Sequence, residues 1–270
     1  MAGRTEADTN ALNVNQPHLL HVFDPPLRRL EVVTAASTYE SHADANATVW
    51  HDLKAQLGEK LFDGPMCRFE GFDPTPARPV LRVSRTSYRI FVETNLYGPP
   101  TLPDAALARP IGVSVALETS DGHLALGRRG SGVAYYPNRV HPFAGSLEWP
   151  ADGEPIDPFA DVRRELAEEL DLAADEVVDL RLTGICEDRA LRHPELTFAA
   201  STIATLAELR HRLDAAEHDA IFAVPLTPAD IETVIANEEL TPVARAAVGL
   251  FARNRFRVKS RIGPGDAQGV

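Results

Sequence analysis

A short stretch of the chain carries acidic residues at a spacing that could support metal-dependent chemistry. They are Asp161, Glu165, Glu168 and Glu169. On a helix, residues three and four positions apart share one stripe, so these carboxylates would repel one another unless a cation lies among them. Hard divalent cations such as Mg²⁺ bind oxygen ligands of this kind. The stripe therefore indicates a metal site that could act on phosphate. A solvated acidic helix face is the alternative that the stripe alone leaves open.

The helix that would carry this stripe has a clear start. Asp157 is a good N-cap and Pro158 suits the first helical position, so we expect a helix from there to about Leu170. A second, apolar stripe that can pack on a sheet consists of Phe159, Val162, Leu166 and Leu170. We expect a long loop at Gly130–Ile156 to precede the helix.

Apolar periodicity and turn residues predict the remaining elements. Strands are expected at His18–Phe23, Val80–Val83, Ile111–Glu118, Leu124–Gly127, Leu180–Cys186, Leu196–Thr205 and Ala220–Pro225. Helices are expected at Ala47–Leu61, Ser87–Glu93, Leu206–Leu213, Pro228–Ala236 and Pro242–Arg253. Because strands and helices alternate, with hairpins included, we predict an α/β fold in which helices cover both sides of a mixed sheet.

The pattern changes once along the chain, at a proline-rich linker near Gly98–Arg109. We therefore predict a disordered N-terminus at residues 1–16, an α+β accessory region at 17–105, a main α/β domain at 106–256 and a flexible tail at 257–270. The accessory region is expected to pack on the main domain.

Composition excludes several classes of partner. The net charge of −12 leaves no basic surplus for a nucleic-acid backbone. The N-terminus lacks a signal-peptide pattern and no apolar run is long enough to cross a membrane, so we expect a cytoplasmic protein without a membrane partner. Cys67 and Cys186 lack the number and spacing of a disulfide framework or a metal site. The sequence leaves open whether the protein forms a homodimer.

The acidic helix and the turn before it resemble a known family motif. Phe143-Ala144-Gly145-Ser146-Leu147-Glu148 followed by Arg164-Glu165-Leu166-Ala167-Glu168-Glu169-Leu170-Asp171-Leu172 is similar to the box of the Nudix hydrolases. The chain departs from that box in two ways. Eight residues separate Gly145 from Glu154 and nine separate Glu154 from Arg164, which is more than in the family, and Asp171 replaces the closing glycine. The resemblance implies a Nudix-type α/β/α sandwich over residues 106–256.

Three earlier stretches resemble one Nudix subfamily more narrowly. They are Trp50–Leu53, Leu61–Phe69 and Thr86–Asn95, and the subfamily hydrolyses UDP-glucose and UDP-galactose to UMP and sugar 1-phosphate. This resemblance implies a small nucleotide substrate, most specifically a UDP-sugar, and Mg²⁺ as cofactor with Mn²⁺ as a substitute. One alternative is a hydrolase of the same fold that acts on ADP-ribose, a dinucleotide or coenzyme A. A second alternative, from another functional class, is a non-catalytic domain of this fold that binds a nucleotide.

The resemblance also implies roles for individual residues. Metal ligands would be Glu165, Glu168 and Glu169 with the carbonyl of Gly145, and Arg164 would orient the carboxylates or simply pair with Glu168. The catalytic set would be Glu165, Glu169 and Glu217, where Glu217 or Glu165 is the general base and Glu187 and Asp188 are alternatives. Within the matched stretches, Tyr88 and Asn95 are substrate-binding candidates, with a core tyrosine and a turn asparagine as the alternatives. Independently of the resemblance, Arg128 is a candidate because it lies in the basic, glycine-containing turn Gly127–Gly132, which could meet a phosphate or sugar or could simply be the exit of a hairpin. The expected reaction is metal-assisted attack of water on one phosphorus of a diphosphate.

Overall fold

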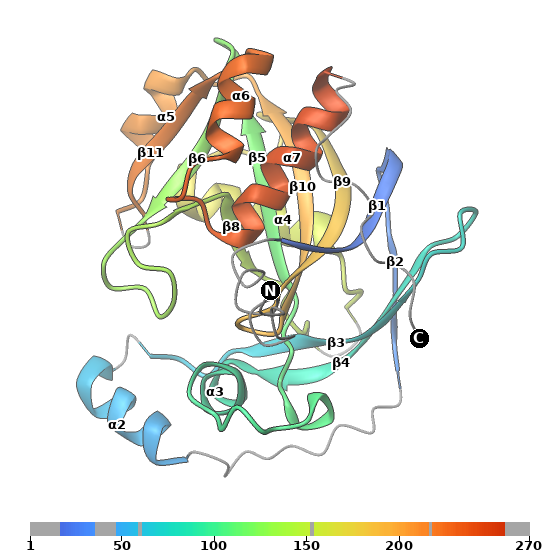
Figure 1. Cartoon of the computed structure of the whole chain (residues 1–270), viewed down its shortest axis with the longest axis vertical. Coiled ribbons are helices and arrows are strands. Elements are labelled where there is room, and N and C mark those ends of the chain that lie inside the picture. Colours follow the sequence, from blue (N-terminus) through green and yellow to red (C-terminus); the bar gives the residue numbers. More distant parts are fainter. Residues whose placement is uncertain (1–16, 36–46, 59–60, 152–153, 216–217, 257–270) are drawn as a thin grey trace, which may run out of the picture.

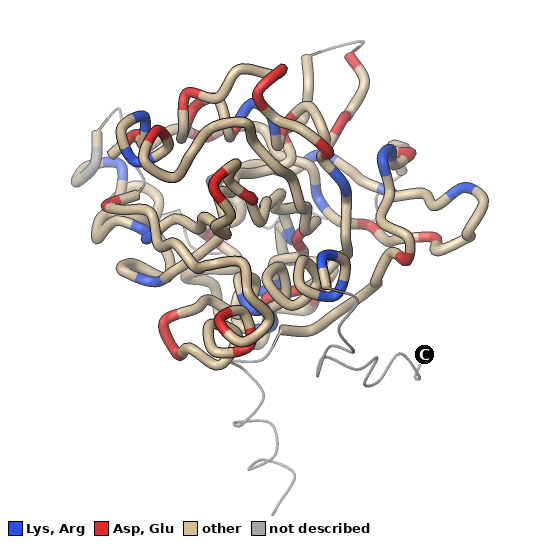
Figure 2. The backbone as a smooth tube through the Cα atoms, turned by 90° about the horizontal axis from the view of Figure 1, so that it is seen from above, with Lys and Arg blue, Asp and Glu red and all other residues tan. Residues whose placement is uncertain are grey.

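A computed structural model describes residues 17–35, 47–58, 61–151, 154–215 and 218–256. The predicted disordered terminus, the predicted tail and Glu217 lie outside the described residues. Within the described part, no helix is long and apolar enough to cross a membrane. In Figure 2, Lys and Arg positions are interspersed with Asp and Glu along the backbone.

A large mixed sheet forms the centre of the molecule (Figure 1). Its strands, in spatial order, are β1 (His18–Leu27), β9 (Val177–Asp188), β10 (His193–Thr202), β5 (Gly112–Glu118), β6 (His123–Arg129) and β11 (His218–Pro225). Two short strands, β7 (Val140–His141) and β8 (Phe143–Ser146), pair with β6 and β5 respectively. Strands β10 and β5 run parallel and the other pairs are antiparallel.

Helices cover both faces of this sheet, which confirms the predicted fold class. They are α4 (Pro158–Leu170) and α5 (Leu206–Arg212) on one face, and α6 (Pro228–Ile235) and α7 (Pro242–Phe256) on the other. Side chains of β5 alternate between the two faces, as they do in any strand. Val113 and Val115 belong to the core that includes α4, whereas Ala116 belongs to the core that includes α7. In Figure 1, α6 and α7 lie in front of the sheet and α4 lies behind it.

The N-terminal residues add a second, three-stranded sheet with the order β2-β4-β3. Its strands are β2 (Glu31–Thr34), β3 (Pro65–Asp73) and β4 (Val80–Ser87), and the helical segments of this region are α2 (Ala47–Leu57), α3 (Tyr88–Phe91), the π-helical turn η2 (Val92–Leu96) and the 3₁₀ turn η3 (Asp104–Ala106). The helix expected at Ser87–Glu93 is thus divided into two kinds of turn. The linker expected at Gly98–Arg109 is part of the fold, because Ala106, Leu107 and Ala108 are buried.

Two backbone hydrogen bonds of Cys67 in β3 join the second sheet to residues that flank β5 and β8. Cys67 N–H donates to Leu147 O (2.9 Å), and Ile111 N–H donates to Cys67 O (2.9 Å). Ile111 and Leu147 are themselves joined, since Leu147 N–H donates to Ile111 O (2.8 Å). Leu81 and Val83 of β4 belong to the same apolar core as the sheet face under α4. The N-terminal region therefore packs on the main domain through backbone and core contacts. The boundary at residue 105 stays a prediction, although β1, on its N-terminal side, is a strand of the large sheet.

Candidate functional site

Local signals position the acidic helix where the sequence predicts it. The Asp157 carboxylate accepts a hydrogen bond from Phe159 N–H at 2.9 Å, and Pro158 begins the helix. Asp171 ends it in the left-handed conformation (φ 49°, ψ 41°) that the family's glycine would adopt without strain. The whole predicted apolar stripe is buried. The acidic residues therefore emerge along a helix whose ends and orientation are fixed.

Gly145 and Glu165, which the box resemblance links, are in contact. Gly145 lies in β8, and a Cβ at this position would overlap the carboxylate of Glu165. The glutamate can therefore approach the strand backbone only because residue 145 is a glycine. This contact brings the turn of the motif and its helix together at one point.

Arg164 lies among three carboxylates of the acidic stripe and the carboxylate of Glu148 in the preceding loop. Its guanidinium lies 2.7 Å from Glu165, 3.2 Å from Glu168, 3.3 Å from Glu148 and 3.5 Å from Asp161. Arg164 makes the contacts that both of its expected roles require. It pairs with Glu168, and it also lies close enough to Glu165 to orient that carboxylate. Burial raises the pKa of Asp161 to about 6, and the positive charge of Arg164 opposes that rise.

Glu169 faces the interior instead. Its side chain is 6% exposed, and Glu169 Oε1 lies 2.9 Å from Nε2 of His218, whose side chain is 2% exposed. The His218 ring lies against Gly127 of β6, where a Cβ would overlap it. No motif of the sequence includes His218, but the structure makes it the first residue of β11 and the partner of Glu169. The sequence carries only an indirect clue to His218, which is Gly127, the glycine that makes room for the ring. No local pattern links Gly127 to residue 218, so the contact could not be predicted from the sequence.

The donor atoms suit a hard cation, although they are not gathered as a group. Among the described residues, no three His, Cys, Asp or Glu side chains are arranged to hold a metal ion. Glu165 lies on Gly145 and Glu168 is exposed beside Arg164, while Glu169 contacts His218. Carboxylate oxygens next to a strand backbone are nevertheless the ligand type that Mg²⁺ prefers.

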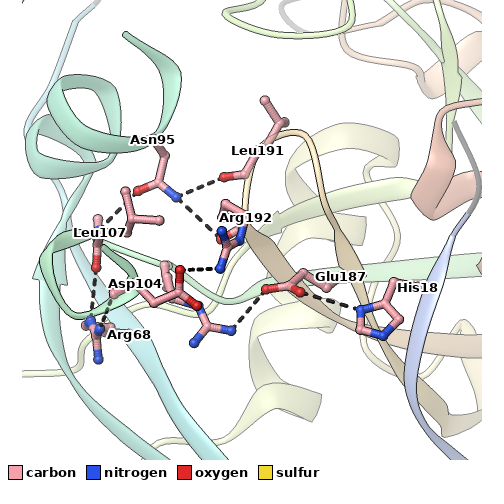
Figure 3. A network of polar contacts seen from close by, with 10 residues as sticks. His18, Arg68, Asn95, Asp104, Leu107, Glu187, Leu191 and Arg192 are labelled. Atoms are coloured by element: carbon pink, nitrogen blue, oxygen red, sulfur yellow. Dashed lines mark hydrogen bonds and ion pairs between the residues drawn. The ribbon is translucent and has the colours of Figure 1, made fainter. Parts of the chain in front are cut away.

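The candidate substrate residues make contacts within the chain. Asn95 Nδ2 donates to Leu191 O (2.8 Å) and to Arg192 O (3.4 Å), while its Oδ1 accepts from Ala108 N–H (3.1 Å) (Figure 3). Asn95 thereby joins η2 to the turn after η3 and to the β9–β10 turn.

The other two candidates lie on different elements. The Tyr88 ring is 6.3 Å from the Trp50 ring and 6.3 Å from the Phe91 ring, measured between centroids. Arg128 pairs with Glu239 at 2.9 Å and donates to Asn138 O at 3.1 Å. Substrate roles for Tyr88, Asn95 and Arg128 stay predictions.

The alternative bases also lie in polar networks. Glu187 contacts Arg109 (3.0 Å) and His18 (3.6 Å), as Figure 3 shows for His18. Asp188 is buried and accepts hydrogen bonds from the N–H groups of Ala190 and Leu191. Glu217, the other base candidate, lies outside the described residues, so its role stays a prediction.

Comparison with known proteins finds likeness only among solved structures. No protein-family model matches the chain, and no curated protein matches it. The protein DR0079 from Deinococcus radiodurans is 20% identical with a TM-score of 0.39, and the match covers 56% of this chain and 87% of that one. A MutT protein from Methanosarcina mazei is 16% identical with a TM-score of 0.38, covering 53% and 93%. A NUDIX hydrolase from Nitrosomonas europaea is 19% identical with a TM-score of 0.37, covering 53% and 87%. Matches at these values do not establish a family or an activity, so functional assignment depends on the residues of this chain.

Proposed function

We propose that the protein is a Mg²⁺-dependent Nudix-type hydrolase that cleaves the diphosphate of a nucleoside diphosphate derivative, with a UDP-hexose as its preferred substrate. The observation that carries this proposal is the contact between Glu165 of α4 and the backbone of β8 at Gly145. The two halves of the motif are 20 residues apart in sequence, Gly145 to Glu165, with a loop longer than the family's between them. Their contact supports the interpretation of the longer loop as an insertion that leaves the motif's geometry intact.

The chain's own residues have separable parts in this proposal. Glu165, Glu168, Glu169 and the carbonyl of Gly145 would hold the ion, which when bound supplies positive charge for the phosphates and a more acidic water. Arg164 orients Glu165, since their side chains lie 2.7 Å apart. His218 orients Glu169 from the buried side. Glu165 or Glu217 takes the proton from the attacking water.

Carboxylates explain why a diphosphate is cut, but they do not select a nucleoside. The UDP-hexose assignment depends on the resemblance of the N-terminal stretches, which pack directly on the main domain. Values of kcat/KM for UDP-glucose, ADP-ribose, NADH and coenzyme A with Mg²⁺ test it. We expect UDP-glucose to be the best substrate, giving UMP and glucose 1-phosphate. A tenfold preference for an adenine nucleotide, about 1.4 kcal/mol of transition-state free energy, would contradict the UDP-sugar assignment and leave the hydrolase assignment intact.

Glu165→Gln and Glu169→Gln test the hydrolase assignment itself. Glutamine keeps the shape of each side chain and removes the charge that a hard cation requires, so we expect kcat/KM to fall by about 100-fold or more with the fold retained. Glu232→Gln on the exposed side of α6 is the matched control and should be unchanged. Activity of either site variant within about threefold of the wild type, at saturating Mg²⁺, would refute the metal-site assignment.

A non-catalytic nucleotide-binding protein is the second candidate. The observation that favours it is that Arg164 already pairs with Glu165 and Glu168, while His218 contacts the buried Glu169. Such a protein would bind UMP or a UDP-sugar without releasing product during a prolonged incubation with Mg²⁺ or Mn²⁺. Release of glucose 1-phosphate from UDP-glucose by the wild type, absent in Glu169→Gln, would exclude this candidate.

A further inference from the structure

A cavity of about 480 Å³ lies between β2 and the loop that connects β8 to α4. One wall is the edge strand at 32–34, and the other consists of loop residues 149–151 and 154–156. The volume is within the range of about 300–1,000 Å³ that is usual for small-molecule sites. We propose that this cavity binds the uracil half of the substrate, with the base stacked on Trp149. The proposal deepens the proposed function and depends on it for the identity of the substrate.

The position of the cavity places a bound base next to the phosphate-cleaving site. Trp149 directly follows Glu148, whose N–H donates to an Asp161 oxygen at 3.3 Å and whose carboxylate lies 3.3 Å from Arg164. Ile156, at the other end of the cavity wall, immediately precedes the N-cap of α4. Both ends of this wall are therefore tied to the acidic helix. A nucleoside diphosphate with its phosphates at the carboxylates would extend its nucleoside toward this loop.

The lining has the chemistry of a base site and not of a phosphate site. Trp149, Pro150 and Pro155 supply flat, rigid apolar surfaces, and an indole can stack on a planar ring. Among the described residues that line the cavity, Glu154 alone carries a charge, and its negative charge disfavours a phosphate. The occupant should therefore be a neutral, planar group.

The edge of β2 supplies groups that can read such a ring. In the described part of the chain, β2 pairs with β4 on one side only. An edge strand presents backbone N–H and C=O groups toward whatever lies beside it. Uracil carries an imide N–H between two carbonyl oxygens. A backbone C=O of the strand edge could accept from that N–H, and backbone N–H groups could donate to the two oxygens. Trp149 lines the cavity together with residues of β2, and its backbone N–H donates to Pro65 O of β3 at 3.2 Å, which holds this end of the loop on the second sheet.

Tryptophan fluorescence tests the proposal directly, because the sequence contains only two tryptophans, Trp50 and Trp149. In the Trp50→Phe protein, all indole emission comes from Trp149. UMP, AMP and glucose 1-phosphate are titrated separately in EDTA, so that no turnover occurs. We expect UMP to quench the emission saturably and glucose 1-phosphate to leave it unchanged. The Trp149→Phe protein, in which Trp50 is the reporter, should show no quenching. Absence of UMP quenching, or quenching by AMP at a tenfold lower concentration than by UMP, would overturn the proposal.

A second variant fills the cavity without touching the core. Ala151 lines the cavity and is exposed, so Ala151→Phe should occupy it while the melting temperature stays close to that of the wild type. We expect the KM for UDP-glucose to rise about tenfold with kcat within about threefold, as for lost nucleoside binding. Ala151→Ser adds little volume and is the control. An unchanged KM in Ala151→Phe would overturn the proposal.

The two tests separate this inference from the proposed function. UMP quenching of Trp149 in a protein that does not hydrolyse UDP-glucose would support the base site and refute the hydrolase. The opposite result is also possible: the protein hydrolyses UDP-glucose, Ala151→Phe does not change the KM, and UMP does not quench the emission of Trp149. This result would support the hydrolase and refute the base site.

Discussion

Two glycines let side chains from distant elements lie directly on strand backbones. Gly145 accommodates the Glu165 carboxylate, and Gly127 accommodates the His218 ring. The first pair could be related from the sequence, because the motif resemblance implies that Gly145 and Glu165 take part in one metal site. The sequence does not predict the second contact, because Gly127 and His218 are 91 residues apart and nothing local in either segment refers to the other. Candidate residues within one motif could thus be predicted, whereas their partners from other strands could not.

Replacing Gly145 tests whether this close approach matters for activity. We expect Gly145→Ala to displace the Glu165 carboxylate and to lower kcat/KM for UDP-glucose by about tenfold or more, as when the surroundings of a metal ligand are disturbed. Gly132→Ala is the control, since a Cβ at Gly132 meets no atom within 4 Å. Equal activity of the two variants would show that the position of Glu165 is not critical.

Two buried histidines make the stability of the fold sensitive to acid. Burial lowers the pKa of His141 and of His193 from the usual 6.5. The unfolded chain therefore takes up protons before the folded chain as the pH falls. Stability contributed by neutral imidazoles is fully present above about pH 6.5 and is lost as the pH falls from there toward the lowered values. The charges that face these rings are Glu195 and Asp188, which reduce the loss, and Arg129, which increases it, while His218 also opposes protonation of His141.

We expect His193→Gln to have a flatter dependence of stability on pH, because glutamine cannot be protonated in this range. Urea unfolding at pH 7.5 and pH 5.5 gives the free energy of unfolding at each pH. The difference between the two should be smaller in His193→Gln than in the wild type. His211→Gln, at an exposed position of α5, is the control. The same pH dependence in His193→Gln and the wild type would contradict this explanation.

At the scale of elements, local capping signals made α4 predictable from Pro158 to its end at Leu170. Strands β2, β3, β7 and β8 were not predicted. The short strands β7 and β8 lie within the stretch expected to be a loop, and each is held by pairing with a longer strand: β8 pairs with β5, and β7 pairs with β6. Strands of two and four residues are too short for an alternation of apolar and polar side chains to be recognised in the sequence. Their backbone pairing could therefore not be predicted.

The end of α4 offers a stability prediction. Asp171 has a left-handed backbone conformation that costs a residue with a Cβ about 1 kcal/mol, a cost that glycine avoids. We expect Asp171→Gly to raise the free energy of unfolding by about 0.5–1 kcal/mol. Asp171→Ala should lower it, because alanine lacks the local hydrogen bonding that lets Asp tolerate this conformation. Urea unfolding checks both variants, and a destabilised Asp171→Gly would refute the account.

At the scale of the whole molecule, the alternation of strands and helices was sufficient to predict a mixed sheet covered on both faces. It could not show how the N-terminal region is attached. β1 pairs with β9, and Phe23 of β1 and Leu81 of β4 belong to the same core as α4. Long-range pairing depends on the complementarity of two surfaces, and neither strand carries a local mark of its partner.

This shared core predicts that the fragment 106–270 does not fold by itself. Removing residues 1–105 exposes one edge of β9 and the apolar face that Cys67, Leu81 and Val83 cover. We expect the fragment to lack a cooperative thermal transition by circular dichroism, whereas the fragment 17–256 should melt as the full chain does. A cooperative transition of fragment 106–270 within about 5 °C of the full chain would indicate an autonomous domain.

The pairing of β1 with β9 also has a consequence for biosynthesis. Leu19 lies opposite Cys186, so the ribosome adds roughly 170 residues after Leu19 before its partner residue exists. At about 5–20 residues per second, this interval lasts roughly 8–35 s. Until then β1 lacks its partner strand, and its unpaired backbone groups can bind a chaperone. Strand β1 therefore joins the large sheet only after β9, which lies far later in the chain, has been synthesised.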